Sequence, residues 1–96
     1  MTVNFNKAFT DNKGAAIEST PNIADAIATH LFNLNHIGGS ATNAEQKYMA
    51  YSLSKRISSD PEAVVLTTEE GSFIKRVCAE VFTAGAYGQI VDLIEG

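Results

Sequence analysis

The stretch LTTEEGSFIKRVCAEVF, from Leu66 to Phe82, is the most informative about the fold because it combines a helix start with a broad apolar face. Thr67 and Glu70 have the spacing of a capping box, in which each side chain accepts a hydrogen bond from the other residue's backbone N–H. The apolar side chains that follow recur at helical steps of three and four: Phe73, Ile74, Val77, Cys78, Val81 and Phe82. This face is wider than a surface helix usually needs, so we expect this helix at the centre of the domain.

The final stretch, FTAGAYGQIVDLIEG (Phe82 to Gly96), predicts one more helix. Its apolar side chains form a single stripe: Tyr87, Ile90, Val91 and Ile94. We expect Gly85 to Gly88 to form a corner that folds this helix back on the preceding one, since a short glycine connection favours adjacent packing. The stripe is then part of the core. If it is an interface instead, its four residues are the candidates for binding a partner.

The beginning of the chain predicts a β-hairpin. Apolar and polar residues alternate in TVNFNKAF (Thr2 to Phe9), which is typical of a strand with one half-buried face. TDNKG (Thr10 to Gly14) supplies turn chemistry, and AAIE (Ala15 to Glu18) is the expected returning strand. A further short extended segment is expected from Ala63 to Leu66, ahead of the central helix.

Two more helices are predicted between these segments. Thr20 before Pro21 has the pattern of an N-cap followed by proline at the first helical position, and the pair Gly38-Gly39 is the expected stop of that helix. TNAE (Thr42 to Glu45) matches a second capping box, which predicts a helix that runs to about Ile57.

Together these elements predict one domain over residues 1–96, of the α+β class and mostly α. An N-terminal β-hairpin is followed by about four short helices. Hydrophobic residues make up 45% of the chain and charged residues 19%, which is typical of a globular domain.

The charge and the apolar pattern exclude several classes of protein. The formal net charge of −4 is the wrong sign for a protein that gains its affinity for nucleic acid by neutralising phosphates. No apolar run approaches the roughly 18 residues of a membrane-spanning helix, and the polar start lacks the features of a signal peptide. We therefore expect a cytoplasmic protein that has no contact with membranes.

The sequence contains no residue set that indicates catalysis. His30 and His36 are six residues apart and not at the spacing that puts two metal ligands on one helical face. Cys78 is the only cysteine, so neither an intrachain disulfide nor a thiolate cluster can form. The G-x-x-G spacing from Gly85 to Gly88 has no cation beside it to hold a phosphate. We expect no enzyme activity, no metal and no cofactor.

A small DNA-binding regulator is the alternative prediction. The last two helices, joined by a glycine-containing turn, have the layout of a helix-turn-helix. Gln89 is the one side chain of the would-be recognition helix that suits base reading. The basic pairs Lys55-Arg56 and Lys75-Arg76 would then contact phosphates. Acidic residues in the last helix argue against this interpretation.

Several segments in chain order resemble small uncharacterised accessory proteins of bacteriophages and prophages. They are FNKAFTDNKG, a helix with Leu31 and Phe32, LTTEEGSFIKRV and the terminal YGQIVDLIE. The resemblance implies an origin in a phage or prophage, a bacterial host and action by protein contact, and it transfers no catalytic or ligand residues. The predicted function is therefore a non-enzymatic factor that binds a host or phage protein, or itself as a homo-oligomer, in virion assembly or in inhibition of a host process.

Overall fold

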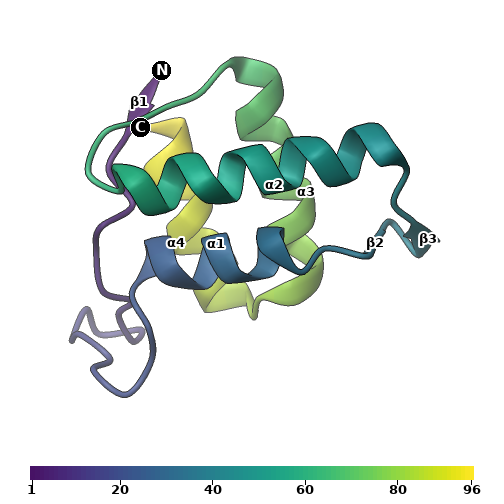
Figure 1. The fold of residues 1–96 in the computed structure, drawn as a ribbon. Helices are drawn as coiled ribbons and strands as arrows, with labels where there is room; N and C mark the ends of the chain where they lie inside the picture. Colours follow the sequence, from purple (N-terminus) through teal and green to yellow (C-terminus); the bar gives the residue numbers. More distant parts are fainter.

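Four helices make up most of the chain in a computed structural model that describes residues 1–96. The helices are α1 (Ile23–Phe32), α2 (Ala44–Ser59), α3 (Thr68–Val81) and α4 (Ala84–Glu95). Consecutive helices form two pairs, and Figure 1 shows the α1–α2 pair lying across the α3–α4 pair. The predicted fold, α+β and mostly α in one compact domain, is confirmed.

The β structure consists of two short antiparallel ladders. β1 (Thr2–Val3) pairs with β4 (Val64–Val65), so that the start of the chain lies beside the segment that precedes α3. β2 (His36–Ile37) pairs with β3 (Ser40–Ala41) between α1 and α2. The extended segment expected near residues 63–66 is confirmed as β4.

The N-terminal hairpin is smaller than the sequence predicts. Its turn is present, because Gly14 has a φ of 87° and the Asp11 N–H donates to the Ala15 carbonyl at 2.9 Å. Only the single bridge between Thr10 and Ala16 joins the two arms as a ladder. The first arm instead runs between distant segments, since the Phe5 N–H donates to the Pro61 carbonyl and the Phe5 carbonyl accepts from the Ala24 N–H. Burial of Val3 and Phe5 against the helices outweighs local pairing.

Two of the three predicted helix N-caps are displaced by one or two residues. Asn22, and not Thr20, caps α1 by accepting from the Asp25 N–H at 2.9 Å. At α2 the capping box is formed by Asn43 and Gln46 in place of Thr42 and Glu45. An asparagine side chain caps at least as well as threonine, so sequence alone does not choose between neighbouring candidates. The third start, Thr67 with Glu70, is confirmed.

Both glycine pairs lie in structures other than those predicted. Gly38 and Gly39, with φ of 62° and 77°, form the turn between β2 and β3, whereas α1 has already ended at Phe32. A two-residue hairpin turn with positive φ at both positions strongly favours glycine. Gly85 and Gly88 lie inside α4, and the corner before that helix is made by Phe82 and Thr83 in extended conformations.

The core is one cluster of 21 buried apolar residues. α3 contributes Phe73, Ile74, Val77 and Cys78, which agrees with the predicted central position of this helix. Its apolar face is narrower than expected, however, because Val81 is 41% exposed. α4 packs against α3, as predicted, and buries Ile90 completely and Ile94 almost completely.

Candidate functional site

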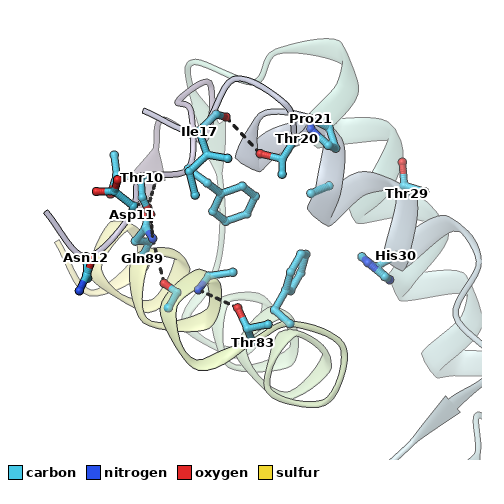
Figure 2. Close-up of a pocket in the computed structure, with 15 residues that line it drawn as sticks. Thr10, Asp11, Asn12, Ile17, Thr20, Pro21, Thr29, His30, Thr83 and Gln89 are labelled. Carbon is cyan, nitrogen blue, oxygen red and sulfur yellow. Dashed lines mark hydrogen bonds between the residues drawn. The ribbon is translucent and has the colours of Figure 1, made fainter. Parts of the chain in front are cut away.

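A pocket of about 500 Å³ opens between the N-terminal loop, α1 and the start of α4. The loop from residue 9 to 21 forms one wall, Thr29 and His30 belong to the wall on α1, and the third wall extends from Phe82 to Gln89. Figure 2 shows Thr29 and His30 on the opposite side of the cavity from Thr10 and Gln89. A cavity of this volume lies in the range typical of small-molecule sites.

Apolar side chains form the inner surface of this pocket: Phe9, Ile17, Ala26, Phe82 and Ala86. The rings of Phe9 and Phe82 lie 6.0 Å apart at a tilt of 44°, and the His30 ring meets Phe82 edge-on at 4.9 Å. Phe82 lines the pocket and is half-buried. Polar side chains surround the opening, so the pocket combines an apolar interior with a hydrogen-bonding rim.

The side chain of Gln89 holds the N-terminal loop against α4. Its Oε1 accepts from the Thr10 N–H at 2.8 Å and from the Thr10 hydroxyl at 3.1 Å. Its Nε2 donates to the Thr10 carbonyl at 2.9 Å and to the Gly85 carbonyl at 3.0 Å. The amide thus pairs with the backbone of Thr10 as a neighbouring strand would, and it fixes one wall of the pocket.

Replacing Gln89 by alanine is expected to release this wall. Loss of the amide leaves the partly buried N–H and carbonyl of Thr10 without a partner, which costs about 1–3 kcal/mol of unfolding free energy. Hydrogen exchange at the Thr10 amide should accelerate, whereas Asp92→Ala on the exposed face of the same helix should leave it unchanged. Equal exchange rates in the two variants would contradict the role given to Gln89.

A second feature is an aromatic surface formed by Phe32, Tyr48 and Tyr51. These side chains are 60%, 70% and 45% exposed, although they come from two packed helices. The Tyr51 ring lies 6.0 Å from Phe32 and 6.2 Å from Tyr48, so the three rings form one continuous patch. An exposed cluster of large aromatic side chains on a small domain is typical of a binding surface.

Two lysines accompany the aromatic surface. The Lys55 ammonium lies 5.9 Å from the centre of the Tyr51 ring. Lys47 is exposed four residues before Tyr51, on the same face of α2. Neither lysine belongs to an ion pair within the chain, and Glu45 is the acidic residue one turn before Tyr48. The part of the patch around Tyr51 is therefore positively charged on a chain whose net charge is −4.

The apolar stripe predicted on the last helix is divided between core and surface. Ile90 and Ile94 belong to the core cluster, Tyr87 is half-buried against it, and Val91 is half-buried. Only the latter two offer apolar area to a partner. Partner binding by this stripe stays a prediction.

The residues predicted for DNA binding are engaged in different ways. Arg56 donates one hydrogen bond to Glu70 at 2.9 Å and another to the Val65 carbonyl. The hydrogen bond from Arg56 to the Glu70 carboxylate holds the pKa of Glu70 below its usual value. Lys75 forms an ion pair with Glu95. Lys55 lies over Tyr51, Arg76 is exposed, and Gln89 is bonded to Thr10. Two of the four cations are thus neutralised, and the amide of Gln89 is directed to the chain itself.

Cys78 is buried in α3, and its burial raises the pKa of the thiol to about 12. An unfolded cysteine has a pKa of about 8.5, so at pH 8 the folded chain carries roughly a thousandfold less thiolate. We expect the folded protein to react with Ellman's reagent at least about 100 times more slowly than the chain in urea. Similar rates would show that Cys78 is accessible and would contradict its place in the core.

The fold contains neither a candidate metal site nor a candidate membrane-spanning helix. No three His, Cys, Asp or Glu side chains lie together so that they could hold a metal ion. None of the helices has the length and apolar character needed to cross a membrane. Comparisons with family models, curated proteins and solved structures find no match.

Sequence reasoning did not identify the pocket or the aromatic surface as sites. The pocket has no local signal, because its walls come from three segments that only the fold brings together. The aromatic surface had one: Tyr48 and Tyr51 lie beside the apolar line of α2 formed by Met49, Leu53 and Ile57, and not on it. Aromatic side chains off the core-facing line indicate exposure.

Proposed function

We propose that this chain is a non-enzymatic factor of phage or prophage origin that acts in the cytoplasm of a bacterial host by binding another protein. The contact is made by the aromatic surface of Phe32, Tyr48 and Tyr51. The observation that carries this proposal is the exposure of three adjoining aromatic rings on a chain of 96 residues. Aromatic residues are enriched at protein interfaces, where they supply large contact area at low entropic cost.

The charge around the patch indicates the chemistry of the partner. Lys47 and Lys55 stand beside Tyr51 and lack carboxylate partners of their own. A partner surface with apolar side chains next to carboxylates would pack against the rings and pair with both lysines. Complementary charge of this kind chiefly sets specificity and association rate, while the buried rings supply most of the affinity.

Affinity capture from a host lysate tests the proposal when three versions of the chain are compared. The patch variant is Tyr48→Ser with Tyr51→Ser, and the matched control is Val65→Ser with Val81→Ser, which removes apolar side chains exposed elsewhere. We expect one protein to be captured by both the parent and the control. The patch variant should capture at least tenfold less of it, since truncating one central aromatic side chain costs about 2 kcal/mol or more of binding free energy.

Two results would count against the proposal, one from this capture experiment and one from a separate measurement of oligomeric state. Equal capture by all three versions would show that binding does not use the aromatic surface. Light scattering after size-exclusion chromatography covers self-association: a dimer of the parent that becomes a monomer in the patch variant would make the partner a second copy of the chain.

DNA binding by the last two helices receives less support from the arrangement of its residues. The predicted base-reading side chain, Gln89, makes four hydrogen bonds within the chain and would have to leave Thr10 to contact a base. Titration against random-sequence duplex at low salt separates the two proposals, because phosphate contacts are strongest there.

A further inference from the structure

We infer that the pocket between the N-terminal loop, α1 and α4 binds a small planar aromatic molecule that carries one hydrogen-bonding group. This inference is independent of the proposed protein contact, because the pocket shares no residue with the aromatic surface. Either can fail while the other holds.

The shape of the pocket is set by bonds within the chain. The Gln89 amide fixes Thr10 on one side, and the Ile17 N–H donates to the Phe9 carbonyl at 2.8 Å within the loop. The Thr20 hydroxyl donates to the Ile17 carbonyl at 3.2 Å, as Figure 2 shows. Because the cavity is largely preformed, the residues that line it lose little conformational freedom when a ligand enters, which favours binding.

The walls favour an aromatic ligand over an aliphatic one. The Phe82 ring is inclined to both the Phe9 ring and the His30 ring, whose centres lie 6.0 Å and 4.9 Å away. Aromatic rings prefer offset or edge-to-face contacts at such separations, so an inserted planar ring can meet faces and edges in its preferred geometries. Ala26 and Ala86 have short side chains and leave room between the helices for that ring.

The polar group of the ligand is inferred from the α1 wall. Thr29 and His30 are exposed at the opening, and Figure 2 draws no hydrogen bond to either side chain. The threonine hydroxyl and the imidazole can both donate and accept. Asp11 at the opposite edge is less free, because its carboxylate already accepts from the N–H groups of Lys13 and Ala15. A hydroxyl or amine on the ligand therefore fits beside Thr29 and His30.

The test uses 2-naphthol as the probe and follows backbone amide signals by NMR. We expect a dissociation constant below about 1 mM, with shifts centred on residues 9–12, 26–30 and 82–89. Decahydro-2-naphthol has the same carbon frame without planar rings, and it should bind at least about five times more weakly because its ring contacts are lost. Ala86→Leu fills the cavity and should weaken 2-naphthol binding at least about tenfold, whereas Ala79→Leu on the exposed face of α3 should not.

Three results would overturn the inference or one part of it. Absence of shifts at the pocket residues up to 5 mM of probe, on the order of five times the expected limit, would overturn the inference. Equal binding by the parent and Ala86→Leu would overturn the location, and equal binding of the two probes would overturn the aromatic preference. Thermal unfolding of each variant verifies that the chain is folded under the conditions in which probe binding is measured.

Discussion

Replacing Phe5 by alanine is expected to lower the free energy of unfolding by about 3–5 kcal/mol. The Phe5 side chain is completely buried, and its backbone joins Pro61 to the start of α1 through hydrogen bonds on both sides. Domains of this size are held by about 5–15 kcal/mol, so the loss is a large part of the total. The N-terminal segment thus stabilises the domain by packing across the helices.

Urea unfolding measures this loss, and Phe32→Ala is the matched control. It makes the same chemical change at a ring that is 60% exposed, so the cavity and most of the transfer cost are absent and we expect a change within about 0.5 kcal/mol. If the two variants unfold at the same urea concentration, Phe5 does not occupy the core. Phe5→Leu keeps most of the buried volume and provides a folded variant if Phe5→Ala is too unstable to measure.

Ile90→Ala should destabilise the domain by about 2–5 kcal/mol, because it leaves a cavity where α4 packs on α3. Val91→Ala, next to it in the same helix but only half-buried, should cost clearly less. Urea midpoints and slopes decide between core and interface. If Ile90→Ala unfolds like the parent while self-association or partner binding is lost, the stripe on α4 is an interface.

Local sequence signals were sufficient to predict the number and order of the helices. The apolar periodicity of α3 and its Thr67–Glu70 capping box gave the central helix with its start at the right residue. Where two capping residues stand close together, tertiary contacts choose between them. Thr42 is excluded from capping α2 because it is buried and bonds to the Asn35 carbonyl through both its N–H and its hydroxyl.

Long-range pairing could not be predicted from the sequence. The alternation of Val3 and Phe5 correctly indicates a face that is buried, but it does not indicate which distant segment lies alongside. Glycine is ambiguous for a similar reason. It permits a helix corner at Gly85 to Gly88 without requiring one, and two extended residues, Phe82 and Thr83, are enough to reverse the chain.

The candidate sites differ in how far sequence reveals them. Tyr48 and Tyr51 can be recognised on a helical projection of α2, but the contact with Phe32 depends on how α1 packs. The pocket depends entirely on the fold, since the Gln89–Thr10 contact joins residues 79 positions apart. Surface features made by packing are visible only after the helices have been assembled.

NMR mapping with a purified captured partner shows which residues of the chain make the proposed contact. The isotope-labelled chain is titrated with the partner, and the aromatic and amide signals are followed. The proposal predicts that the largest changes occur at Phe32, Tyr48 and Tyr51, with smaller ones at Lys47 and Lys55. In the Tyr48→Ser, Tyr51→Ser variant the changes at Phe32, Lys47 and Lys55 should vanish. Changes centred on Tyr87 and Val91, or on the pocket, with the aromatic surface unaffected, would contradict it.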